Sequence, residues 1–254
     1  MKILIGHTGL VGTTLTKSIQ FDQVYNSSNI KEYPTTDKTH SELYLACLPA
    51  EKWKANQDPS SDLLNIQNIF GLISKFKYSK VVLISTIDVY SESPLGSTEA
   101  TVPSFEQWGY GSNRYLFEQM VMMLQSPVKQ VFRLPGLFGE GLKKNLIYDL
   151  IHNHRIEFID PSSTLQWYDL SNLAQDITQT LSPGVFNLFP EPLHTKEIID
   201  LFDYPIENLG TPKHNIMYDF KTKHTLTGYI KDKNQVLTEL SSYINETRNK
   251  LTSI

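Results

Sequence analysis

Tyr110 and Arg114, within the stretch YGSNRYLFEQ, stand four positions apart at the start of a segment with helical character. On a helix this spacing puts both side chains on one face. A phenol beside a guanidinium is suited to proton transfer, because a nearby cation favours the phenolate. The same spacing also occurs between ordinary surface side chains. The pair alone therefore does not decide between a proton-transfer site and a solvated helix face.

A second pattern is the segment GHTGLVG, in which Gly6, Gly9 and Gly12 recur at three-residue spacing. The segment follows an apolar run typical of a strand and opens a helix. Such a turn needs glycine to reverse tightly, to let a pyrophosphate approach the backbone, and to pack the helix on the strand. The helix N-terminus then offers free N–H groups to phosphates. This context favours dinucleotide binding over the alternative, a glycine-rich turn without a ligand.

Short apolar runs alternate with longer periodic ones, which predicts βαβ units around a parallel sheet. The fold class that we expect is α/β, a Rossmann-type doubly wound parallel sheet. The expected strands before residue 135 cover residues 2–6, 23–25, 43–48, 80–86 and 128–134, with helices at 10–19 and 62–76 and the Tyr110 helix between them. Later segments predict helices at 145–153, 170–181, 194–202 and 234–247 and a strand at 184–189.

The expected division is a dinucleotide-binding core at residues 1–135 and a mixed region at 136–254. Within that mixed region, residues from about 164 to 190 return to the core. Residues from about 136 to 163 and from about 190 to 235 form a small interleaved region on the substrate side.

The composition is that of a globular protein, with 40% hydrophobic and 20% charged residues. A formal charge of −4 argues against a nucleic-acid or membrane-surface role, because either needs a basic face. Cys47 is the single cysteine, which excludes an internal disulfide. The N-terminal residues resemble neither a signal peptide nor a membrane span, so we expect a soluble cytoplasmic protein. The seven histidines show no metal-ligand spacing, and we expect no metal.

Several further segments, together with the glycine turn, resemble the extended short-chain dehydrogenase/reductase superfamily, which includes NAD-dependent epimerases and dehydratases. Asn65 in LLNIQNIFGLI resembles the family's helix asparagine, and LISTIDVY resembles its SSxxVYG segment. YGSNR stands where the family has Tyr-x-x-x-Lys. RLPGLFGEGL and GVFNLFPEPLHTKEII resemble two later family segments. The order and spacing of these pieces, which cover most of the chain, carry the resemblance.

The resemblance implies a catalytic set of Tyr110, Arg114 and Thr86. It also implies cofactor contacts, which fall at Gly6, Thr8, Gly9, Leu10, Val11, Gly12, Asn26, Ser27, Ser28, Leu48, Ser85, Arg114 and Pro135. Arg114 departs from the family, whose lysine holds the nicotinamide ribose and lowers the tyrosine's pKa. Arginine keeps the positive charge, but its longer planar fork differs in geometry from an ammonium.

The second predicted strand runs into YNSSNIKEY, which lacks the acid that usually accepts the ribose hydroxyls of NAD. The small polar side chains with Lys31 favour NADP slightly, so the expected cofactor is NAD(P). The alternative is a plain polar turn, because the family includes NAD users without that acid.

Substrate signals are weaker. Asp88 occupies the place of an acid in the catalytic pair of related dehydratases, but Ile87 occupies the other place, which favours epimerisation or carbonyl reduction over elimination. The segment 141–145 could hold a diphosphate or be a solvated basic loop. Gln166, Trp167 and Tyr168 could stack on a base or sugar or belong to the core.

The expected function is an NAD(P)-dependent epimerase, dehydratase or reductase that acts on a nucleotide sugar or a similar hydroxy/keto substrate. The alternative is a non-catalytic NAD(P)-binding sensor or scaffold, since Arg114 replaces the usual lysine. A homodimer is also expected, because residues 116–124 are apolar nearly all round a helix and need cover on both faces.

Overall fold

The computed structural model describes residues 1–33, 41–202, 209 and 215–252. By its internal contacts the chain divides into two units, and the first holds residues 1–134 and 172–187. Its centre is a six-stranded sheet in the order β2-β1-β3-β4-β5-β9, with every neighbouring pair parallel. The strands are β1 (Lys2–Ile5), β2 (Gln23–Tyr25), β3 (Glu42–Leu45), β4 (Lys80–Thr86), β5 (Val128–Leu134) and β9 (Gly184–Asn187).

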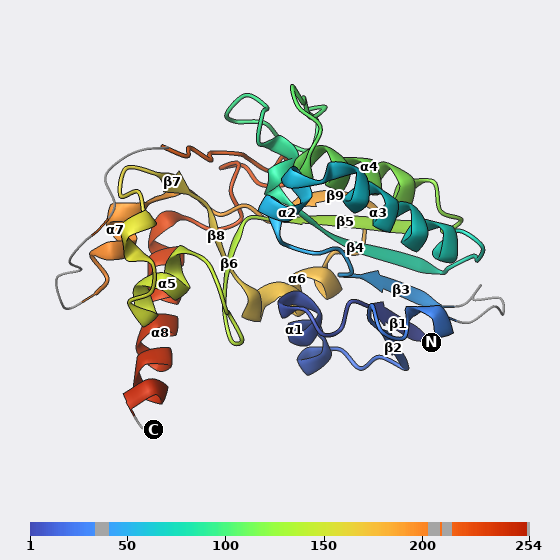
Figure 1. The fold of residues 1–254 in the computed structure, drawn as a ribbon, viewed down its shortest axis with the longest axis horizontal. Coiled ribbons are helices and arrows are strands. Elements are labelled where there is room, and N and C mark those ends of the chain that lie inside the picture. The colour runs from blue at the N-terminus through green and yellow to red at the C-terminus, as the bar shows by residue number, and fades with distance from the viewer. Residues whose placement is uncertain (34–40, 203–208, 210–214, 253–254) are drawn as a thin grey trace. The chain divides into compact units, whose positions relative to one another are not determined.

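Helices cover both faces of this sheet in the first unit (Figure 1). On one face α3 (Pro59–Ile73) and α4 (Tyr110–Met122) pack side by side, with the short α2 (Lys52–Gln57) near their N-terminal ends. On the other face α1 (Leu10–Ser18) packs against α6 (Leu173–Gln179). This arrangement confirms the predicted α/β fold with a doubly wound parallel sheet.

Strand β1 is apolar from Ile3 to Ile5 because its side chains point alternately to the two faces of the sheet and both faces are buried. Ile3 and Ile5 of β1 join the core cluster that also contains Ile66 of α3 and Phe117 of α4. Leu4, between the two isoleucines, points to the opposite face and is fully buried as well. Strands of a parallel sheet covered on both faces bury both sets of side chains.

Strand register puts the carboxyl ends of the strands at one edge of the sheet, although β3 ends opposite Leu83 and β4 continues to Thr86. In the β4–β5 pair, Lys80 lies opposite Val128 and Thr86 lies opposite Leu134, so the two strands end together. Short 3₁₀ turns follow two of the strands: η1 (Ile30–Glu32) lies after β2, and η2 (Ile87–Tyr90) continues directly from β4. Residues 5, 25, 45 and 86 therefore end neighbouring strands at the same edge.

The second unit holds residues 135–171 and 188–254. It contains two small sheets, in which β6 pairs with β8 in parallel and β7 pairs with β10 antiparallel. Its core consists of apolar side chains from these strands and from three helices. The elements are β6 (Gly136–Phe138), α5 (Leu146–His152), η3 (Ile156–Phe158), β7 (Thr164–Leu165), β8 (Trp167–Asp169), η4 (Leu170–Asn172), β10 (Leu193–His194), α7 (Thr195–Ile199) and α8 (Lys233–Thr252).

The segment that returns to the first unit is residues 172–187, shorter than the 164–190 expected from the sequence. Residues 164–169 pair instead with β6 and β10, which places them in the second unit. Of the two alternatives for Gln166, Trp167 and Tyr168, a stacking surface or a place in the core, the structure favours the core. All three are buried, at 1%, 3% and 1% exposure, and Gln166 donates to the carbonyls of Pro190 and Phe220.

Candidate functional site

The glycine turn joins β1 to α1, and two of its glycines are required by backbone packing. Gly6 has φ +100°, and a Cβ there would lie 2.1 Å from the carbonyl oxygen of Ala46. A Cβ at Gly12 would lie 2.0 Å from the carbonyl oxygen of Gly6. No side chain fits at either position. These two glycines therefore let the helix start close against the ends of β1 and β3.

Gly9 differs from the other two glycines because the protein leaves room at its Cβ position. A Cβ there would meet only the Gly6 carbonyl oxygen, at an ordinary 3.7 Å. Gly9 is the N-cap of α1 and supplies no side-chain cap, while the first N–H groups of a helix have no partner inside the helix. The turn thus forms a cradle with free N–H groups at its open side, which fits the phosphates of a dinucleotide.

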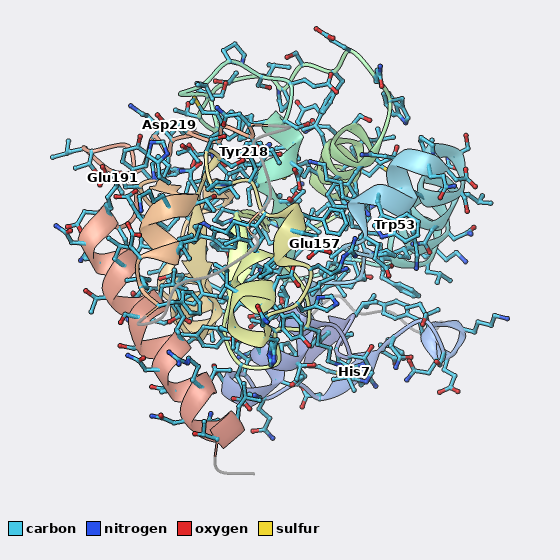
Figure 2. All side chains as sticks on the ribbon, turned by 60° about the vertical axis from the view of Figure 1, so that its left-hand side comes forward. His7, Trp53, Glu157, Glu191, Tyr218 and Asp219 are labelled. Atoms are coloured by element: carbon cyan, nitrogen blue, oxygen red, sulfur yellow. The ribbon has the colours of Figure 1, made fainter. Side chains whose placement is uncertain are left out.

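His7 follows Gly6 in the same turn, between β1 and α1 (Figure 2). Its Nδ1 is buried and has no hydrogen-bond partner within the described part of the chain. Thr8 and Gly9 are exposed, whereas Leu10 and Val11 are half-buried. The turn thus contains a buried polar atom next to its exposed backbone.

At the end of β2, two asparagines close a tight turn. The Asn26 N–H donates to the Asn29 side chain at 2.7 Å, and the Asn26 side chain accepts from the Ser28 N–H at 2.8 Å. The side chains of Ser27 and Ser28 are exposed, as is Lys31 in η1. Asn26 thus shapes the turn, and the two serines are left as the accessible hydroxyls.

At the end of β4, Thr86 caps η2. Its Oγ1 accepts from the Asp88 N–H at 3.1 Å and lies 3.3 Å from Asp88 Oδ2. The other Asp88 oxygen is 2.6 Å from the Lys52 ammonium, which comes from α2. The side chain of Asp88 is 19% exposed and that of Lys52 45%. The hydroxyl predicted to face the substrate therefore lies beside a half-buried ion pair.

The start of α4 is fixed by contacts that place Tyr110 next to η2. The Tyr110 N–H donates to the Asn56 side chain at 2.8 Å, and Ser112 caps Gly109 reciprocally. A Cβ at Gly111 would lie 2.3 Å from the Asp88 carbonyl oxygen. Glycine at this position thus lets the first turn of α4 approach the backbone of η2.

Arg114 lies one turn further along α4, and its guanidinium is paired. Its two terminal nitrogens donate to the Asp62 carboxylate at 2.8 and 3.1 Å, and one also donates to the Pro49 carbonyl at 2.8 Å. The side chains of Arg114 and Asp62 are 5% and 8% exposed. The Arg114 Cζ lies 4.3 Å from the centroid of the Tyr110 ring. The predicted Tyr–Arg pair is therefore in contact, and a carboxylate from α3 completes it.

Tyr110 itself is buried, with 8% of its surface exposed. Burial raises the pKa of its phenol above the usual value, and this is the largest effect. The charge of Arg114 and its hydrogen bonding lower that pKa, while the charges of Asp88 and Asp62 raise it. The net direction is upward, so the phenol is protonated at neutral pH.

Ser85 belongs to a buried network behind the strand ends. Its hydroxyl donates to Glu118 at 2.5 Å, and Glu118 accepts from the Arg133 Nε at 3.0 Å and from an Nη at 2.5 Å. Arg133 also donates to the hydroxyl of Tyr90. The hydroxyl predicted to contact a cofactor thus takes part in a structural network.

Leu48, after β3, packs against the core of the first unit, and Pro135, which follows β5, is buried. Lys143 and Lys144 are exposed, and Asn145 caps α5 by accepting from the N–H groups of Ile147 and Tyr148.

His40 and His214 lie outside the described residues. Within the described residue ranges, no group of three or more His, Cys, Asp or Glu side chains is placed to hold a metal ion. The helices in those ranges include none that is long and apolar enough to cross a membrane.

Sequence reasoning did not find Asp62 or Lys52. Asp62 lies 52 positions before Arg114 and Lys52 lies 36 before Asp88, so no local spacing connects either pair. The only available signal is topological, since α2 and α3 follow the strand next to β4 and begin at the same sheet edge.

Comparison of the sequence with protein-family models gives no match, and neither does comparison with curated proteins. Solved structures do match. The UDP-glucose 4-epimerase of Thermotoga maritima, with UDP-glucose, has a TM-score of 0.76 at 14% identity, covering 99% of this chain and 100% of the other. The dTDP-4-dehydrorhamnose reductase of Bacillus anthracis, with NADP, has a TM-score of 0.70 at 15% identity, covering 97% and 99%.

The Bordetella bronchiseptica enzyme WbmG, in complex with NAD and UDP, has a TM-score of 0.73 at 14% identity, covering 97% of this chain and 94% of the other. At such identities the likeness establishes the fold alone. The chain therefore has the Rossmann-type α/β fold of these epimerase and reductase structures, the fold that the resemblance in its sequence implies.

Proposed function

We propose that the protein binds NAD(P) at the Gly6–Gly12 turn and is an epimerase, dehydratase or reductase of a nucleotide sugar or similar hydroxy/keto substrate. The observation that carries this proposal is the contrast within the turn. Backbone atoms fill the Cβ position of Gly6 and of Gly12. The Cβ position of Gly9 is open, at the start of α1, where no side chain caps the helix. A turn that only connected strand to helix would have no need of a third glycine at that position.

In this proposal the N–H groups of Leu10 and Val11 hold the pyrophosphate, since they lie in the first turn of α1. A bound nicotinamide supplies hydride transfer. Tyr110 gives or takes the proton at the substrate oxygen, and Thr86 hydrogen-bonds that same oxygen. Arg114 holds the nicotinamide ribose and keeps a positive charge beside the phenol.

Structures of the same fold support the substrate class. The Thermotoga protein was solved with UDP-glucose, the Bacillus reductase with NADP, and WbmG with NAD and UDP. For this chain we propose a slight preference for NADP, carried by exposed Ser27 and Ser28 with Lys31 nearby. Replacing Lys31 with Ala should weaken NADP binding and leave NAD binding nearly unchanged.

Calorimetry of Gly9→Val with NAD and with NADP tests the binding site. The valine side chain should enter the space of the pyrophosphate, so the affinity for both dinucleotides should fall at least tenfold, about 1.4 kcal/mol. Gly71→Val in α3 is the matched control, because a Cβ at Gly71 meets nothing within 4 Å and one at Gly9 meets only an ordinary contact at 3.7 Å. Unchanged affinity for both dinucleotides in Gly9→Val would remove the proposed binding site.

Turnover tests the catalytic assignment. Tyr110→Phe should lower turnover of an identified substrate by about 10²-fold or more, the usual contribution of positioned proton transfer, with dinucleotide affinity nearly intact. Arg114→Lys should retain measurable activity because the charge is kept. Unchanged turnover in Tyr110→Phe would contradict the catalytic role.

The second candidate is a non-catalytic NAD(P)-binding sensor or scaffold. One observation favours it. Proton transfer by Tyr110 would use the positive charge of Arg114, and Asp62 pairs with that charge. The two candidates differ in the Tyr110→Phe experiment. A sensor should bind dinucleotide as tightly as before and show no turnover with or without the phenol.

We also propose a homodimer formed through α4. Leu116, Met120 and Met123 follow each other at helical spacing; the first two are half-buried and Met123 is 68% exposed. A second copy would cover this stripe. Light scattering should give a dimer mass at micromolar concentration, and Met123→Glu should shift the mass toward the monomer. A monomer mass for the unaltered protein would reject this proposal.

A further inference from the structure

The pairing of Arg114 with Asp62 is fixed from several directions. Besides the two hydrogen bonds from Arg114, the Asp62 carboxylate accepts one from the Asn113 side chain at 2.8 Å. Asn113 also donates to the Pro59 carbonyl at 2.9 Å, at the start of the helix that carries Asp62. Removal of either charge would leave the other buried and uncompensated. The carboxylate is therefore a built part of the Tyr110 surroundings.

The same pairing determines what Arg114 offers to Tyr110. The guanidinium is held over the ring at 4.3 Å, and its charge is balanced by a carboxylate that is itself buried. An unpaired lysine ammonium would present a full charge. An arginine in a bidentate pair instead has a fixed geometry, and the carboxylate opposes part of its charge at the phenol.

We infer that Asp62 is a positioning residue for Tyr110: it fixes Arg114 against the phenol and opposes part of its charge, which adds to the effect of burial, so that Tyr110 enters the reaction protonated and acts as a proton donor. This inference rests on the proposed function. It favours the keto form of the substrate as the one that is consumed, because a phenol gives its proton to an oxygen that gains electrons, as a carbonyl oxygen does on reduction. The phenolate that remains recovers a proton from water.

The other charges around Tyr110 agree with this direction. From η2, Asp88 faces the phenol and raises its pKa, and Lys52 of α2 is paired with that carboxylate. From α3, Asp62 also raises the pKa, and on α4 itself only Arg114 lowers it. Burial, the largest effect, raises the pKa as well.

The test is a titration of the protein without added dinucleotide. Carbon-13 NMR of Cζ-labelled tyrosine follows each phenol, and the resonance that Tyr110→Phe removes identifies Tyr110. In the unaltered protein we expect the Tyr110 pKa to lie above that of an ordinary tyrosine. In Asp62→Asn, which keeps the shape of the side chain and removes its charge, the Tyr110 pKa should fall.

Two controls separate this effect from general disturbance of α3. Asp58→Asn changes an exposed carboxylate that caps the same helix and should leave the titration of Tyr110 unchanged. Asp62→Glu restores the charge and should restore the pKa. With an identified keto substrate, the alkaline limb of the reduction rate should move to lower pH in Asp62→Asn, because the acid is lost earlier.

Two results would overturn the inference. One is a Tyr110 pKa that is the same in Asp62→Asn as in the unaltered protein. The other is an ionised Tyr110 at neutral pH in the unaltered protein, which also decides the matter should Asp62→Asn not fold. Both are measured without cofactor or turnover, so they are distinguishable from a failure of the proposed function, which the Gly9→Val and Tyr110→Phe experiments report.

Discussion

Replacing Glu118 with Gln should destabilise the first unit more than any surface change. Glu118 and Arg133 are 1% and 3% exposed, and the carboxylate accepts hydrogen bonds from two nitrogens of Arg133 and from Ser85. Glutamine keeps the size and one acceptor oxygen but removes the charge. The guanidinium of Arg133 then remains buried and loses the carboxylate that pairs with it.

The expected cost follows from the burial of both partners. Breaking a buried ion pair on one side typically costs about 3–5 kcal/mol. Arg133 keeps the Tyr90 hydroxyl as a partner, so we expect the lower end, about 3 kcal/mol. Because whole-protein stability is typically about 5–15 kcal/mol, this is a large fraction of it. In a chain of this size it corresponds to a fall of roughly 6–12 °C in Tm.

Urea unfolding followed by circular dichroism measures this cost. Glu51→Gln is the matched control, because Glu51 pairs with Lys54 at the surface and such pairs are worth about 0–1 kcal/mol. The double variant Glu118→Leu with Arg133→Met should recover much of the loss, since it removes both buried charges. A cost for Glu118→Gln no larger than that of Glu51→Gln would refute the reasoning.

Three further predictions concern the backbone and pH. Gly12→Ala should lower the unfolding free energy by at least about 2 kcal/mol because its Cβ meets the Gly6 carbonyl, whereas Gly9→Ala should change it by less than about 0.5 kcal/mol; urea unfolding compares the two. Burial raises the pKa of Tyr33 to about 12, so its contribution to stability is present below pH 10 and is lost between pH 10 and 12. In Tyr33→Phe the alkaline loss of stability should therefore be smaller, by roughly 2–3 kcal/mol, in urea titrations at stepped pH. Asn145→Ala should cost about 1 kcal/mol or more, by thermal unfolding, because it removes the cap of α5 at a residue with φ 137°.

Much of the first unit could be predicted because each of its strands and helices has a signal within its own short segment of sequence. Strands β2, β4 and β5 have the predicted bounds, and the clearest signal is that of β4, whose continuous run VVLI is typical of a parallel strand covered on both faces. The helix beginning at Tyr110 was predicted as well. The second unit was harder, because strands of two or three residues such as β7 and β8 are too short to show alternation.

The candidate site could likewise be predicted only where its contacts lie close together in the sequence. The spacing of Tyr110 and Arg114 predicted a shared helix face, and the structure places the guanidinium over the ring. The partner of that guanidinium could not be predicted, because Asp62 meets it only through the packing of α3 on α4. The dinucleotide site, the homodimer and a cytoplasmic location stay predictions.

The order in which the sheet is completed has a consequence for synthesis on the ribosome. Strand β9 lies beside β5, but the chain must first pass through residues 135–171 of the second unit before it emerges. At about 5–20 residues per second, β5 waits several seconds as an open sheet edge on the nascent chain. Unpaired edges recruit other strands. The interval before β9 arrives is therefore when a nascent chain is most exposed to misassembly, and when a chaperone that covers the edge would help most.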